Sequence, residues 1–209
     1  MNQQTVHLAV YNTLADWEYG YAAAGINDPQ FQREPGRYRV LTVGPSRAAV
    51  TTMGGMRIEP DLAIDELSPE DSAMLIMVGA HTWEARENGA FADAARQFLD
   101  GGVPVAAICG ATWGLADAGL LDEREHTSSA VEYLSFSENY QGHAHYHQEP
   151  ALTDGALITA GPAHPLDFAR HIFAKLELYT PEKLDAWYGY YSTGDAAYFY
   201  KLMPEVAVS

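Results

Sequence analysis

Short apolar stretches alternate with segments of helical periodicity along most of the chain. Apolar runs predict strands at residues 6–11, 38–43, 72–78, 103–108 and 156–160, and the run at 72–78 is almost wholly apolar, as in a strand covered on both faces. Apolar spacing between these runs predicts helices at residues 17–26, 91–99 and 111–118, and another after Pro165. Strands that alternate with helices in this way indicate an α/β fold with a mostly parallel sheet sandwiched by helices.

Two segments depart from this alternation. Residues 50–58 contain the pair Gly54-Gly55, which predicts a small hairpin. Residues 181–200 begin with a good helix start and then carry an aromatic cluster: Trp187, Tyr188, Tyr190, Tyr191, Tyr198, Phe199 and Tyr200. We interpret the chain as one domain over residues 1–178 with an aromatic-rich helical extension over 179–209. The extension is expected either to cover the side of that domain or to shape a dimer surface or the mouth of an active site.

Charge and composition exclude several classes of protein. The 12 Lys and Arg residues stand against 28 Asp and Glu, and the net charge of −16 argues against binding to nucleic acid or to a membrane surface. No apolar run approaches the roughly 20 residues that cross a bilayer, and the first residues lack the features of a signal peptide, so a cytoplasmic location is expected. The single cysteine, Cys109, excludes an internal disulfide framework and a multi-cysteine metal site.

Cys109 lies where a parallel sheet places its ligands. It follows the strand at 103–108 and precedes Gly110, Ala111 and a helix, which is the order of a nucleophile elbow. The N-terminus of the following helix favours a thiolate, so we expect the pKa of Cys109 to lie below the free value of about 8.5. The alternative is an inert, buried thiol, which is the more common role of a single cysteine.

Other strand ends supply partners for this thiol. The strand at 72–78 leads into Gly79, Ala80 and His81, and the backbone N–H of Ala80 is expected to form an oxyanion hole with that of Gly110. Glu18 follows the first strand, at the same edge of the sheet, where a protonated carboxyl would donate a hydrogen bond to the sulfur. The alternative for residues 79–81 is an ordinary turn after a strand. The alternative for Glu18 is a carboxylate that only favours the start of a helix.

Three histidines alternate within residues 142–147. On a strand, His143, His145 and His147 would share one face, where zinc could bind; the alternative is an edge strand whose polar side chains face water. We favour the second interpretation and predict no metal and no cofactor.

Segments 15–18, 78–80, 107–111, 115–121 and 154–160 together resemble the DJ-1/PfpI superfamily, a branch of the class I glutamine amidotransferase-like folds. The resemblance spans residues 5–178 and implies a flavodoxin-like fold and a homodimer. It identifies Cys109 as the elbow nucleophile, Glu18 as the carboxyl group that hydrogen-bonds it, and Ala80 and Gly110 as the oxyanion-hole donors. The tail after Leu178 is similar to an extension in some bacterial members described as amidotransferases or intracellular proteases.

One position departs from the family pattern. Many members have a catalytic histidine at the end of a Thr-Thr-His motif, and here Ser129 stands where that histidine would be. His126 comes three residues earlier and His81 adjoins the oxyanion loop, so His81, His126 and Ser129 are accessory candidates. The missing histidine argues against a Cys-His-Glu triad and the protease or glutaminase activity that depends on it. It favours either hydratase-type chemistry built on Cys109 and Glu18 or a sensor that works through oxidation of Cys109.

Two functions remain open from the sequence. The first is an enzyme of hydrolase or hydratase type, in which Cys109 adds to an amide, carbonyl or isonitrile carbon of a small molecule and Glu18 shuttles the proton. The second is a non-enzymatic sensor of oxidative stress, or a chaperone, that works through oxidation of Cys109. Whichever of the two holds, the aromatic tail and the resemblance predict a homodimer, the charge predicts no nucleic-acid or membrane partner, and the expected partner is a small-molecule substrate.

Overall fold

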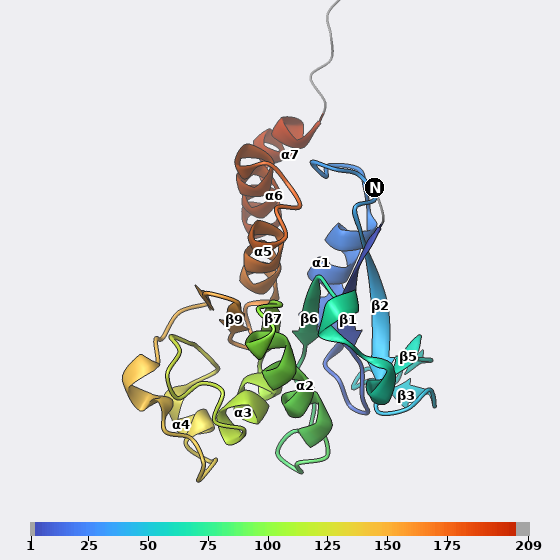
Figure 1. Ribbon diagram of the computed structural model, residues 1–209. Coiled ribbons are helices and arrows are strands. Elements are labelled where there is room, and N and C mark those ends of the chain that lie inside the picture. Colours follow the sequence, from blue (N-terminus) through green and yellow to red (C-terminus); the bar gives the residue numbers. More distant parts are fainter. Residues whose placement is uncertain (1–2, 204–209) are drawn as a thin grey trace, which may run out of the picture.

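A seven-stranded sheet forms the centre of the protein. In the computed structural model, which describes residues 3–203, the strand order is β5-β2-β1-β6-β7-β9-β8 (Figure 1). The strands are β1 (Gln4–Ala9), β2 (Tyr38–Gly44), β5 (Leu62–Ala63), β6 (Met74–Met77), β7 (Val105–Ile108), β8 (Ala151–Asp154) and β9 (Leu157–Ala160). Neighbouring strands are parallel except β8 and β9, which are antiparallel. The predicted α/β fold with a mostly parallel sheet is therefore confirmed.

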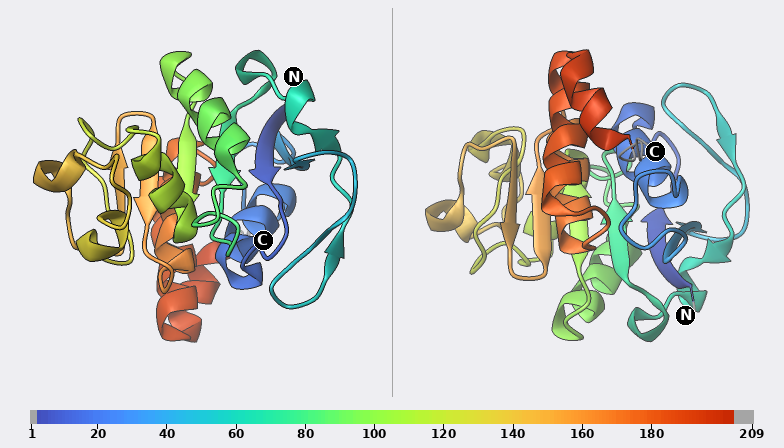
Figure 2. Two further views of the ribbon diagram at one scale, coloured as in Figure 1. Left: turned by 90° about the horizontal axis from the view of Figure 1, so that it is seen from below. Right: turned by 90° about the horizontal axis from the view of Figure 1, so that it is seen from above.

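Helices cover both faces of this sheet (Figure 2). One face carries α1 (Asp16–Asn27) packed against α5 (Pro165–Lys175), and the other carries α2 (Gly89–Asp100) and α3 (Gly110–Asp117), with α4 (Val131–Leu134) beside α3. Every residue of β6 and β7 is buried. This double coverage explains why these central strands are continuous apolar runs instead of alternating ones. Within residues 3–203, none of the helices is both long and apolar enough to span a bilayer.

The turn elements differ in how well the sequence predicted them. The hairpin is present as β3 (Val50–Thr51) paired antiparallel with β4 (Arg57–Ile58). The strand expected at residues 142–147 is wrong, because Gly142–His145 forms a 3₁₀ turn. His145 and His147 instead bond to the two carboxylate oxygens of Glu125. In the described chain, no group of three or more His, Cys, Asp or Glu residues is arranged to hold a metal ion.

The C-terminal extension forms α6 (Pro181–Thr193) and α7 (Ala196–Leu202). As predicted, α6 begins at Pro181, and the Thr180 hydroxyl caps it by accepting the Lys183 N–H at 3.3 Å. Trp187 packs edge-on against Phe173 of α5, with ring centroids 4.8 Å apart. The extension therefore covers part of the domain. Part of its aromatic surface stays open, since Tyr191, Phe199 and Tyr200 are exposed.

Candidate active site

Cys109 occupies a strained turn between β7 and α3. Its backbone has φ 60° and ψ −127°, a conformation that costs a non-glycine residue about 1–3 kcal/mol. Hydrogen bonds hold the turn in place: the Cys109 N–H donates to the carbonyl of Ala160 at 3.1 Å, and the Thr112 hydroxyl donates to the carbonyl of Cys109 at 2.6 Å. The half-buried thiol is thus presented at the carboxyl end of the sheet, as a nucleophile elbow requires.

Glu18 is the carboxyl group that faces this thiol. It lies in the first turn of α1, and its side chain is completely buried. The Gly79 N–H donates to Glu18 Oε2 at 2.6 Å, and the Cys109 thiol lies close enough to lower the pKa of the carboxyl group. Within residues 3–203, Glu18 Oε1 has no nitrogen or oxygen partner. The structure thus brings together two residues that are 91 positions apart in the sequence, as the sequence predicted.

Gly79 makes this close approach possible, a role that was not predicted for it. A Cβ atom at position 79 would lie 2.7 Å from Cys109 Sγ and 3.0 Å from Glu18 Oε2. The first distance is far shorter than van der Waals contact and the second is short by a few tenths of an ångström, so a side chain here would displace the thiol and crowd the carboxyl group. The sequence did contain an indication of this role. A glycine at the end of a buried strand often marks a place where two other groups approach the backbone closely.

The electrostatics of the pair differ from the expectation. Burial raises the pKa of Glu18 to about 7, although the Gly79 N–H and the thiol act in the opposite direction. Burial and the negative charge of Glu18 raise the pKa of the Cys109 thiol, and the Gly110 N–H that faces the sulfur only partly offsets them. The low thiol pKa predicted from the helix N-terminus is therefore wrong, because burial and the neighbouring Glu18 make a second negative charge costly at this position. The directions of the two shifts favour a protonated thiol beside a carboxyl group that can take up a proton near neutral pH.

The two predicted oxyanion donors lie on neighbouring segments. A Cβ atom on Gly110 would be 3.4 Å from the nitrogen of Ala80, which places the two backbones in contact. The Ala15 N–H donates to the Gly79 carbonyl at 2.9 Å and so fixes the loop that carries Ala80. The Gly110 N–H faces the sulfur, and the Ala80 nitrogen lies in the segment next to Gly110. The oxyanion hole built from these two amides stays a prediction.

The accessory candidates are less well placed. His126 is fully buried, with its Nδ1–H directed at the Arg124 carbonyl (2.6 Å) and its Nε2 accepting from the Tyr140 hydroxyl (2.8 Å). Burial also lowers the pKa of His126, so neither ring nitrogen is free to move a proton at Cys109. Ser129 is exposed and lines a separate hollow with His164. His81 is exposed beside Ala80, and its backbone N–H donates to Thr13.

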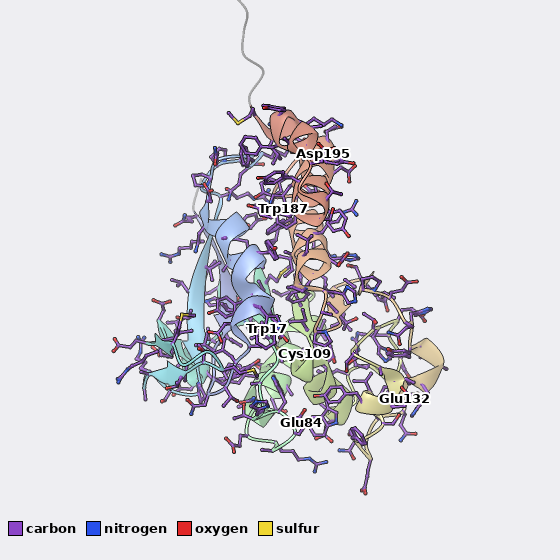
Figure 3. The ribbon with its side chains drawn as sticks, turned by 180° about the vertical axis from the view of Figure 1, so that it is seen from behind. Trp17, Glu84, Cys109, Glu132, Trp187 and Asp195 are labelled. Atoms are coloured by element: carbon purple, nitrogen blue, oxygen red, sulfur yellow. The ribbon has the colours of Figure 1, made fainter. Side chains whose placement is uncertain are left out.

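Two groups that no sequence pattern indicated, Tyr133 and Glu84, interact electrostatically with the thiol. The Tyr133 hydroxyl of α4 donates to Glu84 Oε1 at 2.7 Å. The charges of both Cys109 and Glu18 raise the pKa of Tyr133, as does Glu84, so the phenol lies within reach of the pair's electric field. Figure 3 shows Glu84 and Cys109 at the same end of the molecule, and Trp187 and Asp195 toward the opposite end. The sequence offered one indication of Glu84, which follows the predicted oxyanion donor Ala80 by four residues in the same loop.

The protein has a mostly parallel sheet, a strained cysteine just beyond a central strand, and a buried carboxyl group against that cysteine. These features define an α/β protein of the nucleophile-elbow class. The sequence profile of the DJ-1/PfpI family matches residues 4–175. The chain belongs to the DJ-1/PfpI family.

Individual relatives agree with this assignment. An uncharacterized protease of Bacillus subtilis, YoaZ, is 37% identical over 97% of this chain and 98% of its own length. The crystal structure of a thiJ/pfpI family protein from Bacillus anthracis has a TM-score of 0.91 and is 39% identical, covering 97% of this chain and 98% of that one. A deglycase of Pyrococcus abyssi is 32% identical over 44% of this chain and 55% of its own length. The first two alignments extend through the C-terminal extension.

Proposed function

We propose that the protein is a cysteine-dependent enzyme of hydrolase or hydratase type that acts on a small molecule. The observation that carries the proposal is the strained Cys109 held against the buried carboxyl group of Glu18 across Gly79. A structural cysteine would need neither the strain nor a buried acid beside it. The relatives named as a protease and a deglycase support a hydrolytic type of reaction.

The resting protonation of the pair indicates how the reaction begins. A base with a pKa of about 7 suits proton transfer at neutral pH, and that is the pKa of Glu18. As Cys109 Sγ bonds to the electrophilic carbon of an amide or aldehyde, its proton passes to Glu18, and the carbonyl π electrons move to the oxygen. The Ala80 and Gly110 N–H groups stabilise that oxyanion. In an amide, protonated Glu18 then returns its proton to the departing amine, and water hydrolyses the thioester to regenerate the thiol.

The same protonation argues against the sensor alternative. Peroxide oxidises thiolates, and sensor cysteines therefore have a lowered pKa and good access to solvent. Here burial and Glu18 raise the pKa of Cys109. General-base activation during attack fits this environment better than a resting thiolate does.

A turnover screen with and without the nucleophile tests the proposal. Amides, reactive aldehydes such as methylglyoxal, and isonitriles would be assayed with the wild type and with Cys109→Ala, a substitution that the elbow can accommodate because it only removes the sulfur. We expect at least one class to be converted by the wild type and conversion to fall to background in Cys109→Ala. Turnover that persists in this variant, or none with any class, would contradict the proposal.

We also propose that a second copy of the chain covers the open aromatic face. A groove of about 600 Å³ runs between α1, α6 and α7 and is lined by aromatic side chains, among them Tyr21, Tyr179 and Trp187. Trp17, Tyr191 and Phe199 at this groove are 52%, 49% and 36% exposed. Aromatic surface of this extent is a feature of interfaces, and an apolar centre is needed to offset the repulsion between chains of charge −16.

Light scattering tests the dimer with charged substitutions on this face. Deleting the extension would uncover Phe173, so Tyr191→Glu combined with Phe199→Glu is the better change. We expect about twice the 22.9 kDa chain mass for the wild type and a monomer for this variant. Phe136→Glu is the matched control, because Phe136 is 77% exposed and does not line the groove. A wild-type monomer, or a variant that remains a dimer, would refute the proposed interface.

A further inference from the structure

A buried tyrosine holds the stretch of backbone that leads into the site. Tyr11 follows β1, and its hydroxyl donates to the carbonyl of Val78 and accepts the N–H of the same residue at 3.1 Å. Val78 is fully buried and is the first residue beyond the end of β6. The tyrosine hydroxyl therefore takes the place of a backbone partner for the polar groups directly before Gly79.

The planar peptide between Val78 and Gly79 connects Tyr11 to Glu18. In a trans peptide the C=O and the N–H lie in one plane and point in opposite directions, so fixing one fixes the other. The C=O of this peptide accepts from the Tyr11 hydroxyl and from the indole N–H of Trp83, the latter at 2.9 Å. The N–H on its other side donates to Glu18 Oε2 at 2.6 Å. A rotation of this peptide would break both sets of bonds together.

Trp83 joins the same unit to the helix that follows the elbow. Its indole N–H also donates to the Tyr11 hydroxyl at 3.1 Å, and the two rings meet edge-on with centroids 5.5 Å apart. Its backbone N–H donates to the carbonyl of Ala80 at 3.3 Å. The indole packs directly on α3, since a Cβ atom would lie 3.2 Å from the ring on Gly110 and 2.2 Å from it on Gly114. The two aromatic side chains thus form one buried unit between the loop after β6 and α3.

We propose that Tyr11 is a positioning residue of this site: its hydroxyl sets the orientation of the peptide between Val78 and Gly79 and so holds the Gly79 N–H on Glu18. The inference rests on the proposed function, because Glu18 is the proposed base. The phenol suits this role at any pH near neutrality, since burial raises its pKa above the ordinary value of 10 and the hydroxyl keeps its proton.

The proposal has a consequence that a purely structural hydrogen bond lacks. The Gly79 N–H lowers the pKa of Glu18, which burial raises to about 7. Loosening this bond should raise the pKa further, because the carboxylate loses part of a hydrogen-bond donor. In the described chain, the charge of Glu18 also raises the pKa of Cys109, Tyr11 and Tyr133. Removing the Tyr11 hydroxyl leaves Cys109 and Tyr133 in place and takes away no charge near neutral pH.

Tyr11→Phe tests the proposal, because it removes the hydroxyl and keeps the ring that packs against Trp83 and Phe91. We expect the pKa of Glu18 to rise by about 0.5–1, the scale of a weakened hydrogen bond to a charged group. A ¹³C NMR titration of the glutamate carboxyl carbons measures it without any substrate, and the spectrum of Glu18→Gln identifies the Glu18 signal. With a substrate that the wild type converts, the acidic limb of kcat/KM should move to higher pH. We expect kcat to fall about 10-fold and KM to change less than about 2-fold.

Tyr38→Phe is the matched control. Tyr38 is also buried, and its hydroxyl donates to the carbonyl of Leu176 at 3.1 Å, but it lies at the start of β2, away from the strand ends that carry the site. Each substitution removes one buried phenol from a backbone carbonyl. Purely structural roles would lower the stability of both variants and leave the pKa of Glu18 unchanged in both. Trp83→Phe, which removes the indole N–H, should raise this pKa in the same direction and decides the matter if Tyr11→Phe does not fold.

The outcomes separate this inference from the proposed function. An unchanged pKa of Glu18 in the folded test variant, or an equal rise in Tyr38→Phe, overturns the positioning role even if Cys109 supports turnover. If neither Tyr11→Phe nor Trp83→Phe folds, the unit is structural and the proposal is wrong. A raised pKa in Tyr11→Phe alone, without turnover of any substrate class by the wild type, would refute the enzyme and leave the role of Tyr11 established.

Discussion

Glu18→Gln is expected to slow turnover by about 10²-fold or more at neutral pH while it lowers the pKa of the Cys109 thiol. The amide keeps the shape of the side chain and still accepts the Gly79 N–H through its oxygen, so the fold should be retained. It removes the negative charge that opposes the thiolate, which lowers the thiol pKa. It also removes the base that takes the proton during attack. More thiolate with less turnover is the signature of a lost proton shuttle.

Ultraviolet absorbance of the thiolate and steady-state kinetics over a pH series measure the two effects. Glu18→Leu serves as the second variant, since it removes both the base and the acceptor of the Gly79 N–H. If both variants turn over substrate as fast as the wild type does, Glu18 is only a residue of the first helical turn. If Glu18→Gln raises the thiol pKa, the charge effect assigned to Glu18 is wrong.

The buried acid also predicts how stability depends on pH. The pKa of Glu18 rises from 4.5 in an unfolded chain to about 7 in the fold, so the folded state holds a proton that the unfolded state has released. The stabilisation is complete below about pH 4.5 and is lost as pH rises through 7. Comparing denaturation of the wild type and Glu18→Gln cancels the titration of all other acids. The free energy of unfolding of the variant should decline less over this interval.

The apolar pattern predicted the sheet because burial on both faces leaves a direct trace in the sequence. The strands β6 and β7 are apolar at every position, and their predicted ends lie within a few residues of the observed ends. The histidine segment failed for the opposite reason. Alternation of polar residues is also compatible with a 3₁₀ turn, and the contact that fixes His145 is a carboxylate 20 residues away, which no local pattern contains.

The sequence predicts that Cys109 and Glu18 lie at the same edge of the sheet. It does not predict the direction in which the thiol pKa shifts there. Cys109 and Glu18 both follow strands, and parallel strands bring such ends together. Whether the thiol pKa rises or falls depends on burial and on the distance to the carboxyl group, and both are tertiary quantities. Tyr133 and Glu84 were missed because α4 reaches the site through packing against α3.

Gly79→Ala adds one methyl group and should lower both the stability and the turnover of the protein. The added Cβ would lie 2.7 Å from Cys109 Sγ and 2.9 Å from Cys109 Cβ, so the cysteine side chain or its strained backbone must shift. Because φ of Gly79 is not in the left-handed region, alanine fits the backbone and the cost comes from the collision alone. Overpacking of this kind typically costs about 1–3 kcal/mol of stability. Separating the thiol from its base should also lower turnover by roughly 10²-fold or more.

Gly20→Ala is the matched control for that substitution. Gly20 lies on α1, the helix that carries Glu18, and a Cβ there meets nothing within 4 Å. Alanine at this position should keep turnover unchanged and raise helix stability by about 0.5–1 kcal/mol. Chemical denaturation and single-turnover kinetics of both variants separate the two effects. Wild-type rates in Gly79→Ala would mean that close contact between Cys109 and Glu18 is unnecessary, because that contact is what the absent side chain of Gly79 permits.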